Sequence, residues 1–259
     1  MNGATRIAAP LLATLLVACP ASEEYLRKGN VMFSNGQLDQ AEQFYAQALE
    51  ADEDSVRALD GLGNVAFERK KYDVAIDFYE RAVKVNPDAI AARHHLAVAL
   101  SSAGRIEDAK KALLATIESA PDDVFAFFSL GGLYDKSGDA KQAEEMFAKA
   151  LAIDEDHRPS RYALAILLTN AGRTEEAERQ LTRLTQAGAK GLAAYGYARI
   201  AAKAGENAEA AKHLEDVLAA GVDHPEKILA DAAFSKAWSA PEMQAVRKKL
   251  AATTSTVSE

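Results

Sequence analysis

The sequence has few of the residues from which catalytic, metal or nucleic-acid sites are built. It contains one cysteine in 259 residues, so no disulfide can form within the chain. Its formal net charge is −8, and it has no basic stripe that would attract the phosphate backbone of a nucleic acid. Neither common glycine-rich phosphate-binding pattern occurs in it. The composition therefore argues against nucleic acid as a partner.

Candidate metal ligands and catalytic groups are equally sparse. The five histidines are His94, His95, His157, His213 and His224. No two of them share a helical face at a spacing of three or four, and no second cysteine accompanies them, so a zinc site is not expected. The acidic segments 52–54 and 154–156 lack the glycine and the terminal glutamate of a calcium-binding loop. We therefore expect no catalytic residue, no metal and no cofactor.

Long apolar runs are also lacking, apart from one at the start of the chain. It covers residues 7–18 and follows a single positive charge at Arg6. A helix of this length reaches about 18 Å, which is short of the ~30 Å hydrocarbon core of a bilayer. A charged start and a short apolar segment are typical of a secretory signal peptide. We expect residues 1–18 to be such a signal peptide.

Small and large residues recur at a constant interval of 34 residues in the remainder of the chain. The central series is Ala41, Ala75, Ala109, Ala143 and Ala177. A bulkier residue follows each alanine by four positions, at Tyr45, Tyr79, Leu113, Phe147 and Leu181. A small residue precedes each alanine by twelve positions, at Gly29, Gly63, Ala97, Gly131 and Ala165. The small residue is expected where two helices cross closely, with the large side chain filling the space beside the crossing.

Apolar residues spaced by three and four on both sides of a short polar turn predict two amphipathic helices in each unit. Glycine stands where the first helix should end, at positions 36, 104, 138, 172 and 205, and it tolerates the left-handed conformation that helix C-termini often require. The second unit has Arg69-Lys70-Lys71 in this place instead. The alternative, a nonrepetitive helical bundle, would not place glycine in this register.

This 34-residue pattern resembles the tetratricopeptide repeat, a helix–turn–helix unit. The resemblance implies an all-α fold, a right-handed superhelix (an α-solenoid) of about six repeats. The repeats would span residues 22–55, 56–89, 90–123, 124–157, 158–190 and 191–224. The sequence departs from the family at Arg93 and Arg161, where a large residue is usual, and it keeps the closing proline only at Pro87 and Pro121.

The last part of the chain is expected to cover the sixth repeat, because the final hairpin of a solenoid otherwise exposes an apolar face. Residues 225–250 are interpreted as capping helices, over 226–233 and 242–250, and residues 251–259 as a frayed tail. Trp238, the sole tryptophan, is interpreted as a residue of the cap core. The alternative for Trp238 is a contact with a partner protein.

The segment Leu16-Val17-Ala18-Cys19 resembles the lipobox of bacterial lipoproteins. The resemblance implies that Cys19 receives a diacylglycerol, that the chain is cut before it, and that residues 19–21 are a short linker to the first repeat. Since Pro20 rather than aspartate follows the cysteine, it also implies lipid anchoring at the periplasmic face of the outer membrane. The inner membrane and the cell surface remain alternatives, as does an ordinary secretory signal with an incidental cysteine.

Tetratricopeptide repeats bind their partners along a concave groove that is lined by the first helix of each repeat. Transferred onto this sequence, the groove positions combine aromatic, aliphatic, amide and charged side chains. They are Leu26, Asn30, Phe33, Arg57, Asp60, Asn64, Phe67, His94, Val98, Phe125, Phe128, Tyr162, Ile166, Tyr195 and Arg199. An exposed surface of this kind usually binds protein, and the sequence does not distinguish a helix from an extended peptide as the ligand. The alternative is that individual rings pack within the fold.

The sequence therefore predicts a non-enzymatic, lipid-anchored scaffold that binds another protein of the bacterial cell envelope. Its plan is similar to that of the pilotin lipoproteins that help type IV pilus secretins assemble, and of repeat lipoproteins of gliding motility. An adaptor for cell-wall hydrolases and a homo-oligomeric structural lipoprotein are the alternatives. An enzyme or small-ligand receptor would require ionisable groups to converge, for which the candidates are His213, Glu215, Asp216 and His224.

Overall fold

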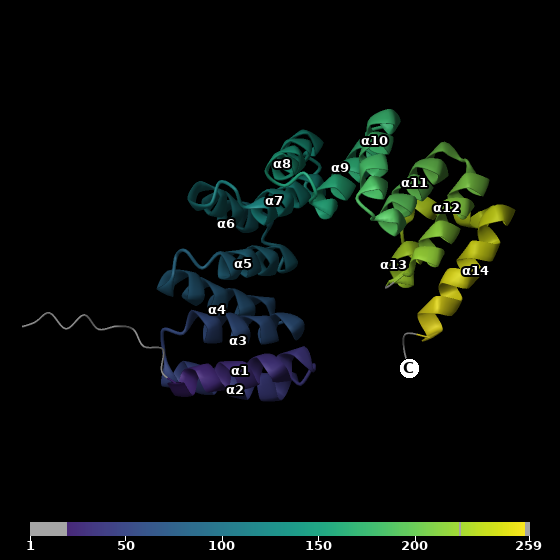
Figure 1. The fold of residues 1–259 in the computed structure, drawn as a ribbon. Helices are drawn as coiled ribbons and strands as arrows, with labels where there is room; N and C mark the ends of the chain where they lie inside the picture. The colour runs from purple at the N-terminus through teal and green to yellow at the C-terminus, as the bar shows by residue number, and fades with distance from the viewer. Residues whose placement is uncertain (1–19, 223, 257–259) are drawn as a thin grey trace, which may run out of the picture. The chain divides into compact units, whose positions relative to one another are not determined.

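The computed structural model describes residues 20–222 and 224–256. Cys19 and the expected signal peptide lie outside the described residues. Every regular element within these ranges is helical, with fourteen α-helices and two short 3-10 helices (Figure 1). The predicted all-α class is confirmed. None of the helices within these ranges is both long enough and apolar enough to cross a membrane.

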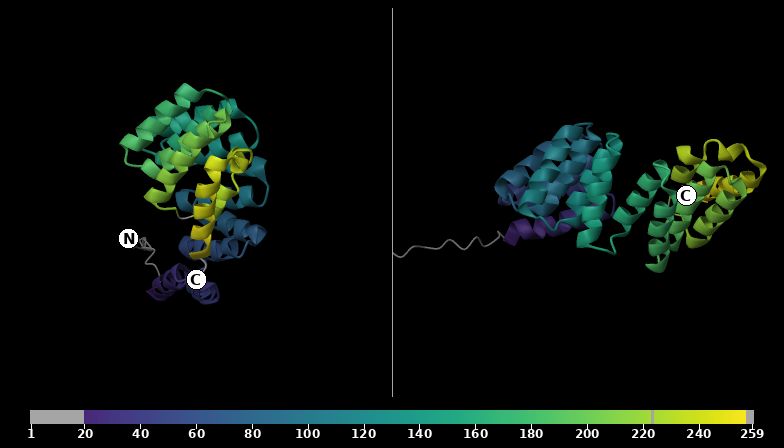
Figure 2. Two further views of the ribbon diagram at one scale, coloured as in Figure 1. Left: turned by 90° about the vertical axis from the view of Figure 1, so that its right-hand side faces the viewer. Right: turned by 90° about the horizontal axis from the view of Figure 1, so that it is seen from above.

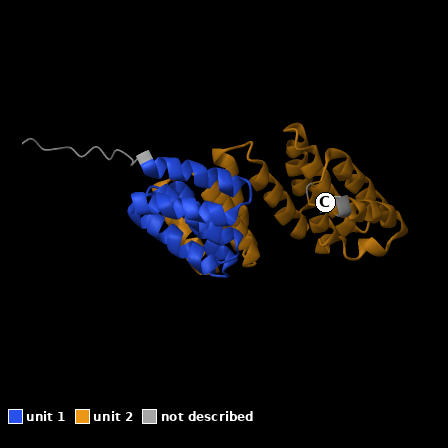
Figure 3. Ribbon diagram, turned by 90° about the horizontal axis from the view of Figure 1, so that it is seen from below, with its two compact units in different colours: residues 1–105 blue, residues 106–259 orange. Residues whose placement is uncertain are grey.

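The first of two compact units extends to Arg105 (Figure 3). Its helices are α1 (Pro20–Ser34), α2 (Leu38–Ala51), α3 (Val56–Glu68), α4 (Tyr72–Val85) and α5 (Ile90–Ser102). Each helix contacts the next one, and α3 also contacts α1 and α5. The first helices of successive repeats are therefore neighbours. We call the surface of α1, α3 and α5 the A-helix face of the first unit.

The second unit begins at Ile106. Its repeat helices are α6 (Ile106–Ser119), α7 (Val124–Lys136), α8 (Ala140–Ile153), α9 (Arg158–Asn170), α10 (Thr174–Gln186), α11 (Lys190–Ala204) and α12 (Asn207–Ala220). Each of these helices contacts the next, and α9 also contacts α7 and α11 (Figure 2). The surface of α7, α9 and α11 is the A-helix face of the second unit.

The boundary between the units falls inside the third repeat, with α5 in the first unit and α6 in the second. The sequence had predicted one uninterrupted array. This repeat departs from the helix-pairing pattern, as does the fifth repeat at Arg161, Ala165 and Leu181. Arg93 stands at the large apolar position, and the glycine-and-ring pair of other repeats is replaced by Ala97 and Leu113.

A buried ring against glycine holds the helices of several repeats together. The Tyr45 ring is so close to two helices that a Cβ at Gly29 would lie 2.6 Å from it, and a Cβ at Gly61 2.7 Å. The corresponding distance is 2.6 Å between Gly131 and the ring of Phe147. Carbon atoms normally approach to about 3.5–4.0 Å, so only glycine fits at these crossings. The predicted role of the small and large residues is confirmed.

Left-handed backbone conformations end most of the first helices. Gly36, Gly104 and Gly138 have φ values of 72°, 79° and 81°. Lys70 occupies the equivalent turn of the second repeat and has a φ of 59°, the one non-glycine residue with positive φ within the described ranges. A side chain in this conformation costs about 1–2 kcal/mol, which explains why the other turns use glycine.

The chain beyond α12 differs from the expected pair of helices. A short helix, α13 (Pro225–Leu229), is followed by two 3-10 helices, η1 (Ala232–Phe234) and η2 (Ala237–Ser239), and by α14 (Pro241–Thr256). Residues 251–256 are therefore helical, which corrects the expected frayed tail. No glycine or proline follows Pro241, and alanine continues a helix readily.

Apolar residues of the cap pack against the sixth repeat in one cluster. Phe234, Met243 and Leu250 are each 0% exposed and belong to the same cluster as Leu214 of α12. Trp238 is 6% exposed in this cluster, so it is a core residue of the cap rather than a surface contact.

Adjacent glycines of α7 provide a test of the ring-on-glycine contact. Gly131→Ala should lower the free energy of unfolding by about 1–3 kcal/mol, because the new methyl group meets the buried Phe147 ring. Gly132→Ala should raise it by roughly 0.5–1 kcal/mol, because a Cβ there meets nothing within 4 Å. Urea denaturation of both variants measures the difference. Equal effects of the two substitutions would contradict the proposed constraint.

Candidate functional site

Two tyrosines connect the core of the first unit to its A-helix face. The Tyr45 hydroxyl donates a 2.8 Å hydrogen bond to Asn30 Oδ1, and the Tyr79 hydroxyl donates a 2.7 Å bond to Asn64 Oδ1. The two bonds are equivalent, since both their donors and their acceptors are 34 residues apart. Each ring therefore fills a helix crossing while its hydroxyl orients an amide on the candidate binding surface.

The second of these bonds belongs to a longer polar network. Asn64 Nδ2 donates to Asp60 Oδ2 at 3.2 Å, and Asp60 Oδ1 lies 2.7 Å from His95 Nδ1. The rings of His95 and Tyr79 are 5.5 Å apart. The hydrogen bond with Asp60 raises the pKa of His95, although burial acts in the opposite direction. Burial raises the pKa of Tyr79, so its hydroxyl stays protonated and remains a donor.

The other predicted residues of this face differ in exposure. Arg57 is exposed and forms an ion pair with Glu23 at 2.8 Å. Phe67 is half-buried, with its ring 5.4 Å from that of Tyr72, and Val98 is 37% exposed. Phe33 and His94 are half-buried.

Leu26 differs from the sequence-based expectation, because its side chain is 2% exposed and offers no surface to a partner. It packs in the core cluster that contains Ala41, Tyr45 and Leu62. An aliphatic side chain at this position gains from burial in the adjoining core, whereas its polar equivalent Asp60 stays at the surface.

Aromatic side chains gather on the A-helix face of the second unit. The ring of Phe128 lies 6.1 Å from that of Phe147 and 5.5 Å from that of His157. Tyr162 and Tyr195 are stacked, with their ring centroids 6.3 Å apart. Phe128, Tyr162 and Tyr195 therefore pack partly within the fold, which was the alternative interpretation of these rings.

Exposure singles out Phe125 among the aromatic residues of this face. Its side chain is 38% exposed, more than an aromatic residue of a helix core would be. Ile166 is half-buried on α9. Phe125 is therefore the ring of this face that is most accessible to a partner protein.

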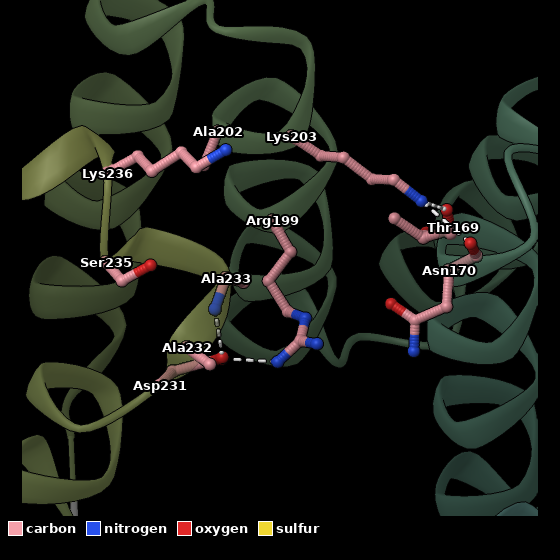
Figure 4. A pocket seen from close by; sticks show the side chains of 10 residues that line it. All are labelled: Thr169, Asn170, Arg199, Ala202, Lys203, Asp231, Ala232, Ala233, Ser235 and Lys236. Atoms are coloured by element: carbon pink, nitrogen blue, oxygen red, sulfur yellow. Dashed lines mark hydrogen bonds and ion pairs between the residues drawn. The ribbon is translucent and has the colours of Figure 1, made fainter. Parts of the chain in front are cut away.

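The last groove residue, Arg199, is held by the cap. Its guanidinium forms an ion pair with Asp231 through Nη1, and the Tyr195 hydroxyl donates to the same carboxylate oxygen. Arg199 and Asp231 border a pocket of about 390 Å³ between α9, α11 and the cap (Figure 4). Sequence reasoning missed Asp231, because nothing in a non-repeating segment marks it as a neighbour of Arg199.

The ionisable groups proposed for an enzymatic site do not form one cluster. His213 lies 3.7 Å from Asp216, but Glu215 pairs with Lys249 at 2.7 Å and His224 with Glu226 at 3.1 Å. Within the part of the chain that the structure describes, no group of three histidine, cysteine or acidic residues is placed to hold a metal ion.

Comparison with protein families decides the affiliation of the chain. Two models of the tetratricopeptide repeat match it, one over residues 22–88 and the other over residues 66–130 and 136–195. The chain belongs to the tetratricopeptide repeat family. A comparison with curated proteins gives no significant match.

Solved tetratricopeptide repeat structures resemble this chain over most of their own length. A repeat protein from Parabacteroides merdae shares 22% identity, covering 89% of this chain and 97% of that one, with a TM-score of 0.67. Pseudomonas aeruginosa pilF shares 21% identity over 81% and 97% of the two chains, with a TM-score of 0.65. MamA from Desulfovibrio magneticus shares 17% identity over 66% and 97%, with a TM-score of 0.57. At these identities the likeness shows the fold.

The His95–Asp60 contact generates a prediction about pH. Asp60→Asn should lower the pKa of His95, because the hydrogen bond to a carboxylate is lost while the burial of the ring remains. Titration of the His95 ring signals by NMR measures the change. Asp54→Asn removes an exposed carboxylate of the same unit and should leave the His95 titration unchanged. An unaltered pKa in Asp60→Asn would show that the pair does not form.

The same contact makes a contribution to stability whose sign follows from the raised pKa. Because folding raises the pKa of His95, the pair stabilises the fold fully below the ordinary histidine value of about 6.5. This contribution is lost as the pH rises through the folded-state pKa. Asp60→Asn should therefore reduce the free energy of unfolding more at pH 5.5 than at pH 8.5, roughly one unit below and two above that ordinary value.

Proposed function

We propose that this protein is a lipid-anchored scaffold of the bacterial cell envelope that binds a partner polypeptide on its A-helix faces. The observation that carries the proposal is the exposure of apolar side chains on these faces, with Phe125 at 38% and Val98 at 37%. Aromatic anchors surrounded by polar groups are typical of protein-binding surfaces. Such a scaffold would recruit or stabilise an envelope complex.

Oriented amides support a polypeptide ligand for the first unit. Tyr45 and Tyr79 fix the oxygens of Asn30 and Asn64. The amide nitrogen of Asn30 has no partner among the described residues, so it remains available as a donor to a carbonyl group of a ligand backbone. A fixed donor loses little conformational freedom when a ligand binds.

The envelope location rests on the lipobox-like segment that ends at Cys19. An apolar run followed by this segment accounts for export and for a covalent anchor. The similarity in fold to pilF is compatible with the secretin-assembly role of the pilotin lipoproteins. We favour this role, or one in motility machinery, over an adaptor of cell-wall hydrolases.

Site-specific photocrosslinking in cells tests the binding surface. A crosslinking amino acid in place of Phe125 should capture one discrete envelope protein. The same amino acid in place of Leu114 should not, because Leu114 is 44% exposed in the same unit but lies on α6. Phe125→Ala should weaken binding of the captured protein about tenfold. Identical products from both positions would exclude the A-helix face, and a product that contains only this chain would indicate a homo-oligomer.

Metabolic labelling tests the anchor. The wild-type chain should incorporate labelled palmitate and fractionate with membranes, and Cys19→Ser should lose both properties. Incorporation of label into the Cys19→Ser variant, or no incorporation into the wild type, would refute lipidation at this residue. The folded repeats serve as the control, since the variant should retain the helical circular dichroism of the wild type.

A further inference from the structure

The pocket between α9, α11 and the cap has a positive charge in a protein that is acidic overall. Its lining includes Arg199, Lys203 and Lys236 and a single carboxylate, that of Asp231. The formal charge of the lining is therefore +2, whereas that of the whole chain is −8. Charges of one sign around a concave site attract ligands of the opposite sign.

Asp231 positions Arg199 rather than simply neutralising it. One carboxylate oxygen accepts from the backbone N–H of Ala233 at 2.9 Å, and the other accepts from Arg199 and from Tyr195. Asp231 is thus held by three donors, and it fixes one side of the guanidinium. Figure 4 shows the guanidinium between Asp231 and the side chain of Asn170.

The other edge of the Arg199 guanidinium, formed by Nε and Nη2, has no acceptor among the described residues. Nη1 is committed to Asp231, whereas the buried Nε has no hydrogen-bond partner among the described residues. A buried donor without a partner is costly and calls for an explanation. Nε is shielded from solvent, so Nη2 is the atom of this edge that remains open to a hydrogen-bond acceptor in the pocket.

Two lysines add to this site from different elements. Lys203 donates to the carbonyl oxygens of Thr169 and Asn170, at 2.6 and 2.8 Å, which holds its ammonium at the end of α9. Lys236, in the turn after η1, has an exposed side chain with no partner among the described residues. The charge of Lys203 is therefore held in place, whereas that of Lys236 is free to contact a ligand.

We infer that this pocket binds a carboxylate group of the partner polypeptide, with Nη2 of Arg199 as the hydrogen-bond donor and Lys236 as a second contact. The inference rests on the proposed function and specifies the partner, which must present an acidic side chain or its C-terminal carboxylate. The site is formed by the fifth and sixth repeats and the cap, and the cap residues that complete it have no equivalent in the other repeats.

NMR titration of the full chain carrying Cys19→Ser tests the inference. The probes are an acetylated and amidated alanine pentapeptide with a central glutamate, its glutamine counterpart, an acetylated alanine pentapeptide with a free carboxyl end, and inorganic phosphate. The Arg199 Nε–H signal, identified by its loss in Arg199→Lys, should shift saturably with at least one carboxylate peptide. The glutamine peptide should leave it unchanged. The two carboxylate probes distinguish an acidic side chain from a chain end.

Matched lysine variants separate a local contact from a general effect of charge. Lys236→Gln should weaken binding of the carboxylate peptide about threefold. Lys248→Gln removes an equal charge from an exposed position on α14 outside the pocket and should leave the affinity unchanged.

Three results would overturn the inference: no shift with either carboxylate peptide, equal effects of the two lysine variants, or a response to phosphate alone. If the carboxylate inference is wrong, crosslinking from position 125 should still capture the partner. If that crosslinking fails, the carboxylate peptides should still bind in the pocket.

Discussion

The contact between a buried ring and a glycine backbone is the constraint on which the rest of the structure depends. It brings two helices closer than any side chain at the crossing would allow, and Tyr45 makes it with two helices at once, at Gly29 and at Gly61. The stacked helices in turn place α1, α3 and α5 side by side in the first unit, and α7, α9 and α11 in the second. The candidate binding faces are therefore a consequence of how the core is filled.

Tyrosine at this position has a second effect that phenylalanine and leucine lack. The hydroxyls of the buried Tyr45 and Tyr79 hold the side chains of Asn30 and Asn64 on the adjacent face. The repeats built on Phe147 or Leu181 have no such donor. Correspondingly, the first unit presents a network of polar groups, whereas the second unit presents stacked rings and an arginine. The nature of the ring in the core thus decides the chemistry of the adjacent face.

The 34-residue periodicity predicts the fold well, because the small and large residues that form a helix crossing recur at fixed spacings along the sequence. It predicts side-chain contacts less well. Leu26 occupies a groove position of the family but packs in the core, since equivalence of backbone position does not determine where an aliphatic side chain gains most from burial. The pairing of Arg199 with Asp231 could not be predicted. The cap is not a repeat, so its residues have no equivalent positions elsewhere in the chain from which their neighbours could be inferred.

The cap has a consequence for assembly. Met243, Val246 and Leu250 of α14 face the sixth repeat and are buried, whereas Gln244, Arg247 and Lys248 of the same helix are exposed. One side of α14 thus covers the last apolar surface of the array, and the other exposes polar and charged groups together with small alanines. The covered end leaves no apolar surface of the sixth repeat on which a second molecule could stack, which disfavours fibre growth in that direction.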